Sequence, residues 1–192
     1  MTTVQQPGRE TSRWLRSYYF LRAGVSVGWV VAACIIGKAM PPAAAVLLVA
    51  YPAWDAVANV IDARRSGGVA ANPSQALNAA ASTVVAIAMA VALGGGLHAV
   101  LAVFGVWAIL SGLLQLATGV RRWQAGAQWA MALSGAQSAL AGAHFIAKAS
   151  GAATPGITDI APYAAFGAFY FLVSAVWLTL AQARKDATER TA

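Results

Sequence analysis

Charge is the scarcest property of this sequence. Only 10% of its 192 residues are Asp, Glu, Lys or Arg, whereas 59% are hydrophobic, and the mean hydropathy is +0.64. Soluble domains carry about a quarter charged residues. So few charges cannot cover a water-facing surface of this size. The composition therefore excludes an ordinary soluble domain and favours a protein whose solvent is lipid.

Residues that build chemical centres are also scarce. The one cysteine, Cys34, cannot form a disulfide within the chain, and only two histidines are present. No zinc-ligand spacing or nucleophile triad is visible, and the run 94–96 of three glycines lacks the context of a phosphate-binding loop. We therefore predict no catalytic residues, no cofactor and no metal site, and a protein that is not an enzyme.

Six long apolar runs are present instead. Each is close to the roughly 20 residues that a helix needs to cross the hydrocarbon layer, and none alternates with a period of two. The runs are 14–37, 41–63, 74–93, 97–120, 126–147 and 160–183. The predicted fold is all-α: a polytopic integral membrane protein with six transmembrane helices. They form a domain over 14–183 between polar tails 1–13 and 184–192, arranged as three repeated hairpins, 14–65, 74–122 and 126–185.

The net charge of +7 predicts an orientation rather than a nucleic-acid partner, because the basic residues stand in short clusters between the apolar runs. If the six spans alternate in direction, one side of the membrane receives Lys38 and Lys148. The other side receives Arg9, Arg13, Arg16, Arg64, Arg65, Arg121, Arg122, Arg184, Lys185 and Arg190. This bias predicts cytoplasmic N- and C-termini, with the lipid bilayer and its anionic inner headgroups as partners.

The second, fourth and sixth runs share a frame. An aromatic residue is followed after four positions by Asp or Ser, then by a small residue, and nine positions later by Arg. The members are Tyr51, Asp55, Ala56 and Arg65; then Trp107, Ser111, Gly112 and Arg121; then Tyr170, Ser174, Ala175 and Arg184. The offsets are 56 and 63 residues. The frame predicts three helical hairpins, although any helix that turns one face into a bundle can show it.

The stretch 105–122, together with 128–135 and 138–142, resembles the HdeD-type acid-resistance membrane proteins, a short-repeat family without assigned biochemistry. The resemblance implies a six-helix protein of the bacterial inner membrane connected with acid or other envelope stress. It supplies no catalytic residues. The sequence departs from the family pattern at Pro52 and Asp55 and in a longer loop over 148–159.

The second run is the most informative of the six, because it carries two carboxyl groups. One helix face carries Tyr51, Asp55, Asn59 and Asp62. Asp55 precedes Arg64 by nine residues, which places it roughly 13 Å deeper in the membrane along the helix axis. A charge at that depth costs about 2.5–3.5 kcal/mol, so it must be paired, protonated or exposed to water or protein. We name a candidate intramembrane polar site, whose members are Arg22, Asp55, Asn59, Asn78 and Gln115. Three interpretations stay open: an Arg22–Asp55 pair that pins the first hairpin, a proton or ion site at Asp55, and Arg22 extending to the inner interface.

Two histidines, His98 and His144, belong to the outer side. They are candidate pH-sensing residues if they approach each other or Asp159, and otherwise two unrelated interfacial histidines. Small residues spaced by four, such as Gly24 and Gly28, indicate close-packing faces within the chain or between copies, which leaves a homo-oligomer open.

The leading functional hypothesis is a non-enzymatic membrane protein of HdeD type, linked to acid or other envelope stress. The first alternative is a small transporter or channel for protons, ions or a solute, built around Asp55. The second alternative is a membrane scaffold or assembly partner.

Overall fold

The computed structural model describes residues 7–121 and 129–191, and the regular structure in them is helical throughout. The six long helices are α1 (Pro7–Ala32), α2 (Pro41–Arg65), α3 (Pro73–Ala92), α4 (Leu97–Arg121), α5 (Trp129–Ala149) and α6 (Ala161–Thr191). Three short elements join them: a π-helical turn η1 (Ala33–Gly37) and the 3-10 turns η2 (Leu93–Gly95) and η4 (Ile157–Asp159). The predicted all-α class is confirmed for this part of the chain.

Five of the helices, α1, α2, α3, α4 and α6, contain an apolar stretch long enough to cross a membrane. Helix α5 has 21 residues but is not among the five; its sequence includes Gln137, Ser138 and His144. These polar side chains lower its hydropathy. The crossing by α5 therefore stays a prediction, whereas the other five apolar runs are confirmed as long apolar helices.

The first and last helices extend beyond their apolar runs. Helix α1 begins at Pro7, inside the segment 1–13 expected as a polar tail, and α6 continues to Thr191, inside 184–192. A helix satisfies its own backbone hydrogen bonds, so it can continue from lipid into water. Proline at the first helical position is favourable because its missing N–H has no partner there in any case. The same reason explains why α2 and α3 begin at Pro41 and Pro73.

The connection between α2 and α3 is a short, hydrogen-bonded loop. The Asn72 side-chain amide donates to the carbonyl oxygens of Ser66 and Gly68, both at 2.8 Å. Gly67 and Gly68 have φ angles of +100° and +99°, which L side chains rarely adopt. This loop holds the carboxyl end of α2 beside the amino end of α3, and so fixes which side chains of the two helices face each other.

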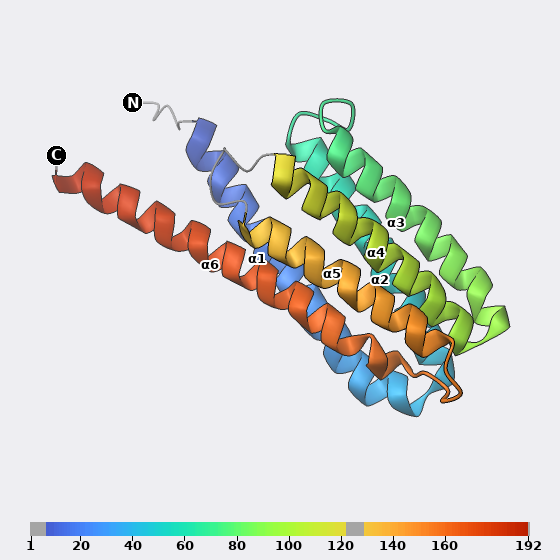
Figure 1. Cartoon of the computed structure of the whole chain (residues 1–192). Coiled ribbons are helices and arrows are strands. Elements are labelled where there is room, and N and C mark those ends of the chain that lie inside the picture. Colours follow the sequence, from blue (N-terminus) through green and yellow to red (C-terminus); the bar gives the residue numbers. More distant parts are fainter. Residues whose placement is uncertain (1–6, 122–128, 192) are drawn as a thin grey trace. The chain divides into compact units, whose positions relative to one another are not determined.

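The chain divides into two compact units. One contains α1 and α6, and the other covers 33–160 with α2 to α5. In the first unit the two helices run antiparallel (Figure 1), and the Tyr19 and Phe171 rings stack with centroids 6.2 Å apart. In the second, each helix packs against the next in sequence, from α2 through α3 and α4 to α5. The predicted hairpins 14–65 and 126–185 each span both units and stay predictions.

An aromatic cluster forms the core of the second unit. Phe104 is 1% exposed and meets Trp107 and Phe145 edge-to-face, at centroid distances of 5.3 and 5.4 Å. Tyr51 lies 6.1 Å from the rings of both Phe104 and Trp107. The cluster therefore joins α2, α4 and α5. It also brings together Tyr51 and Trp107, two aromatic residues of the repeated sequence frame.

The outward-facing side chains are apolar and large. In the described part of the chain, seven aliphatic or aromatic side chains are each more than 60% exposed: Ile35, Val46, Val84, Ile87, Val91, Leu140 and Trp177. They are distributed over η1, α2, α3, α5 and α6. A water-soluble protein rarely exposes so many large apolar groups, because they would drive association. This surface matches a lipid environment, in agreement with the apolar helices.

Candidate functional site

A polar cluster with two buried members, Asn59 and Ser82, lies between α2 and α3. Ser82 donates its hydroxyl hydrogen to Oδ2 of Asp55 over 2.8 Å, and the side-chain amide of Asn59 donates to the same oxygen over 3.1 Å. The Asn59 amide also donates to the backbone carbonyl of Asp55 over 2.8 Å. Ser82 is 1% exposed and Asn59 is 8% exposed. The structure thus brings together two predicted site residues, Asp55 and Asn59, and adds Ser82 to them.

A second carboxylate repeats this arrangement one step along the same interface. The side-chain amide of Gln75 on α3 donates to Oδ2 of Asp62 over 3.3 Å. Asp62 follows Asp55 by seven residues and Gln75 precedes Ser82 by seven, so both bonds fit one antiparallel register. The two hydrogen-bonded pairs are two helical turns apart, which is about 10 Å along the helix axis. We call Asp55, Asn59, Asp62, Gln75 and Ser82 the α2/α3 polar ladder.

One atom of this ladder is unsatisfied. Oδ1 of Asp62 is buried and has no hydrogen-bond partner among the described residues. A buried polar atom without a partner costs free energy, and more so if it carries charge. Asp62 lies near the carboxyl end of α2, three residues before Arg65.

The contact between α4 and α5 is built differently. A Cβ atom added at Gly112 would lie 2.5 Å from the backbone nitrogen of Ala139 and 2.5 Å from the carbonyl oxygen of Gly135. One added at Gly105 would lie 2.8 Å from the carbonyl oxygen of Gly142. The two backbones therefore touch along a glycine seam, defined by Gly105, Gly112, Gly135 and Gly142. Such small residues allow the close approach typical of membrane helices.

Ser138 adds a polar contact to this seam, since its hydroxyl donates to the backbone carbonyl of Ala108 over 2.9 Å. A hydroxyl group and small residues thus form the contact between α4 and α5. Helices α4 and α5, as described, contain no Asp or Glu.

Arg22 lies in the other unit, at the contact of α1 and α6. Its guanidinium carbon is 4.3 Å from the centroid of the Phe171 ring and 5.8 Å from that of Tyr18. Its Nη1 also donates to the Tyr18 hydroxyl over 3.4 Å. The cation is therefore held by aromatic faces within its own unit. The Arg22–Asp55 pair, which would join the two units, stays a prediction.

Asn78 and Gln115 complete the predicted site but are not joined to it. Asn78 lies on α3 about one turn from Ser82, and Gln115 lies on α4. Within 7–121 and 129–191, no hydrogen bond connects either side chain to Asp55. The ladder is thus a property of α2 and α3 only.

Ser82 is the residue that the sequence prediction missed as a partner of Asp55, although a signal exists. The 56-residue offset that relates α2 to α4 also relates α3 to α5. At this offset in the sequence, Leu77 corresponds to Leu133, Ala79 to Gly135, Ser82 to Ser138, Ala86 to Gly142 and Met89 to Phe145. The same offset relates Ser26 of α1, which is 5% exposed, to Ser82. A serine thus recurs at the buried face of each odd-numbered helix.

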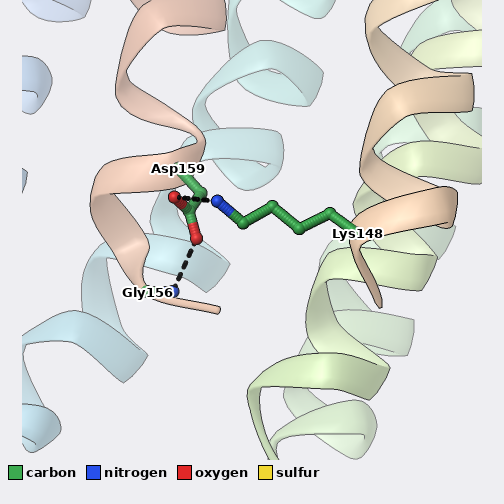
Figure 2. Close-up of polar contacts among 3 residues, drawn as sticks. All are labelled: Lys148, Gly156 and Asp159. Atoms are coloured by element: carbon green, nitrogen blue, oxygen red, sulfur yellow. Dashed lines mark hydrogen bonds and ion pairs between the residues drawn. The ribbon is translucent and has the colours of Figure 1, made fainter. Parts of the chain in front are cut away.

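A second polar contact closes the loop between α5 and α6. Lys148 and Asp159 form an ion pair with 2.7 Å between Nζ and Oδ1, and the backbone N–H of Gly156 donates to Oδ2 over 2.8 Å (Figure 2). Partial burial raises the pKa of the Asp159 carboxyl, but the bond from Lys148, the Gly156 N–H and the charges of Lys148 and His144 outweigh it. The pKa of Asp159 is therefore below its ordinary value. Next to it, Ile157 is buried against Gly37.

The two candidate pH-sensing histidines lie at this same end of the second unit. Nδ1 of His98 is 2.9 Å from the carbonyl oxygen of Ala149, the last residue of α5. The ring must be the donor in this contact, and it can donate whether neutral or protonated. His144 is exposed and acts on Asp159 through its charge. No hydrogen bond joins the two histidines in the described part of the chain.

No group of three or more His, Cys, Asp or Glu side chains that could hold a metal ion occurs in the described residues. The chemistry available in the α2/α3 polar ladder is therefore that of carboxyl, amide and hydroxyl groups. Such groups can bind and exchange protons and donate or accept hydrogen bonds.

Part of the chain matches a known protein family. Residues 77–147, which run from α3 to the last turn of α5, match the family described as "Short repeat of unknown function (DUF308)". No curated protein and no solved structure matches the chain. The matched segment includes the whole glycine seam. It is similar to the membrane-protein family to which HdeD belongs, so the short-repeat resemblance is confirmed over this segment.

Proposed function

We propose that this chain is a non-enzymatic, multi-pass protein of HdeD type in the bacterial inner membrane, and that it helps the cell withstand acid or other envelope stress. One observation carries the proposal. The family match over 77–147 coincides with the glycine seam, where four glycines leave no room for a side chain. The part of the chain that resembles the family therefore contains a close-packing element, which supports a structural role.

The proposed orientation has both termini in the cytoplasm. Arg64 and Arg65 are exposed at the carboxyl end of α2, where they can contact anionic lipid headgroups of the inner leaflet. A reporter fused after the last residue and active only in the cytoplasm should be active in intact cells. Activity of a reporter that works only outside the membrane would contradict this topology.

The proposed repeat unit is an even-numbered helix followed by an odd-numbered one. Helices α2 and α3 form one unit and α4 and α5 form the next, related by the 56-residue offset. Helix α6 carries the frame of the even helices, α1 carries the serine of the odd helices, and these two helices pack together. The two ends of the chain would thus supply the third unit, in place of the hairpins 14–65, 74–122 and 126–185.

The stress role is tested by deleting the gene and measuring survival in acid and under other envelope stresses. We expect reduced survival that is rescued by the natural chain and by Gly28→Ala, because a Cβ at Gly28 meets no atom within 4 Å. Gly112→Leu should fail to rescue, since its side chain has no space in the seam. Normal survival of the deletion strain across all these stresses would refute the proposed role.

A further inference from the structure

We propose that η1 and η4 form a clasp with a closed and an open state, and that the closed state holds the Ala32 end of α1 and the Ala161 end of α6 together. The side chains and positions that make up the clasp are Gly37, Leu47, Lys148, Ile157 and Asp159. This goes beyond the stress role, because it assigns a moving part to the bundle. It stands whether or not the deletion strain is sensitive to stress.

The first step is the position of the two segments in the chain. Helix α1 ends at Ala32 and continues directly into η1, and η4 is followed after one residue by the start of α6. Although α2 to α5 lie between them in the sequence, η1 and η4 pack against each other. They thus join the ends of α1 and α6 as the loop 66–72 joins α2 and α3, but by contacts instead of a continuous chain. Contacts of this kind can open, whereas a loop cannot.

The second step is the backbone of the two segments. The segment η1 is a π-helical turn and η4 is a 3-10 turn. A 3-10 turn has poorer hydrogen-bond geometry than an α-helix, and π-helical turns are frequent at functional sites. Hinges are formed by a few residues at the ends of elements, which absorb the change in backbone angles. The backbone can therefore change at η1 and η4 while α1 and α6 stay helical.

The third step is the apolar contact that closes the clasp. The Ile157 side chain is 4% exposed. A Cβ atom added at Gly37 would lie 3.1 Å from Cδ1 of Ile157 and 3.4 Å from Cδ1 of Leu47. Gly37 is not among the glycines with a positive φ, so it supplies space rather than an unusual backbone angle. That space is filled by a side chain of η4.

The fourth step is the polar contact on the other side of η4. Oδ1 of Asp159 lies 2.7 Å from Nζ of Lys148, which reaches it from the last turn of α5, and Oδ2 accepts the N–H of Gly156 (Figure 2). The Lys148 and Asp159 side chains are 37% and 23% exposed. Water screens such a pair, so its contribution is small. The pair therefore adjusts the balance of the two states rather than locking the closed one.

The test measures the distance between η1 and the start of α6 in the full chain in liposomes, by double electron–electron resonance. Cys34, the one cysteine of the sequence, is exposed in η1 and carries the first spin label. Ala165→Cys, at an exposed position of α6, carries the second. We expect two distances, the shorter one for the closed clasp and the longer one for the open clasp.

Matched variants should change the proportion of the two distances and not the distances themselves. Asp159→Asn should raise the ratio of open to closed clasp about two- to fivefold, because an exposed ion pair contributes no more than that. Gly37→Val should raise the ratio further, since its side chain would occupy the space of Ile157. Thr154→Ala, at an exposed position of the same loop, should leave the ratio unchanged. Far-UV circular dichroism establishes that each variant is folded, and the Asp159→Asn result stands if Gly37→Val does not fold.

Two results would overturn the proposal. One is the same distribution of distances for Asp159→Asn and Thr154→Ala, which would show that the ion pair does not hold η4 in place. The other is a single distance that lengthens gradually from variant to variant, because a contact that merely loosens has no second state.

Discussion

Replacing Gly112 by alanine should weaken the α4/α5 contact. The new Cβ would lie 2.5 Å from Ala139 N and from Gly135 O. Ordinary van der Waals contact begins at 3.4 Å, so the methyl group is about 1 Å too close to two atoms. Both are backbone atoms that cannot rotate away. The helices must therefore move apart along the seam.

The expected magnitude follows from three contributions. Overpacking costs about 1–3 kcal/mol. Separation of the helices also weakens the hydrogen bond from Ser138 to Ala108, which is worth about 0.6 kcal/mol in a membrane protein. Alanine in place of glycine within a helix returns about 1 kcal/mol. The free energy of unfolding should thus fall by about 0.6–2.6 kcal/mol in total.

The assay is unfolding of the purified protein in mild detergent by titration with a denaturing detergent, followed by tryptophan fluorescence and circular dichroism. Gly28→Ala is the matched control, because it gains the same helix propensity and meets no atom within 4 Å. It should be neutral or slightly stabilising. If Gly112→Ala were as stable as Gly28→Ala, the close approach of α4 and α5 would be wrong.

Three further changes test other contacts. Asp159→Asn should lower the free energy of unfolding by less than about 1 kcal/mol at neutral pH. Because folding lowers the pKa of Asp159, the contribution of its pair with Lys148 is complete above the unfolded value of about 3.9 and is lost as the pH falls through the folded value. The natural chain and the variant should therefore converge in acid, and a difference that persists there would contradict the assignment. Phe171→Leu should cost about 1 kcal/mol, since it removes the ring that lies 4.3 Å from the Arg22 guanidinium, measured by the same titration. Gly68→Ala should cost about 1 kcal/mol because alanine is strained at a φ of +99°, and thermal unfolding followed by circular dichroism would reveal it.

Helix positions were the most predictable part of the fold. The apolar run 97–120 became α4, Leu97–Arg121, and the run 74–93 became α3, Pro73–Ala92. Long apolar runs and proline starts are local properties, and a helix forms its hydrogen bonds within one segment. The ends were less predictable. The polar residues after Pro7 and before Thr191 continue as helix, although their composition suggested tails.

The candidate site was predictable only in part. Asp55 and Asn59 are four residues apart, so their contact follows from the helix itself. Ser82 lies 27 residues further along the chain, and many polar residues of the other runs were equally plausible partners. The contact depends on the loop 66–72 and the register of two helices, which no local pattern specifies.

The sequence by itself determined the solvent of this protein and the segments that become helices, because hydropathy and proline act within each run of residues. Only the tertiary structure decided which helices touch and how closely. Three of the seam glycines, Gly112, Gly135 and Gly142, and the alanines that stand 56 residues before them, Ala56, Ala79 and Ala86, look similar in a list of small residues. Yet a single Cβ atom separates a backbone contact from an interface with room for two carboxyl groups, and that difference exists only when two helices are packed together.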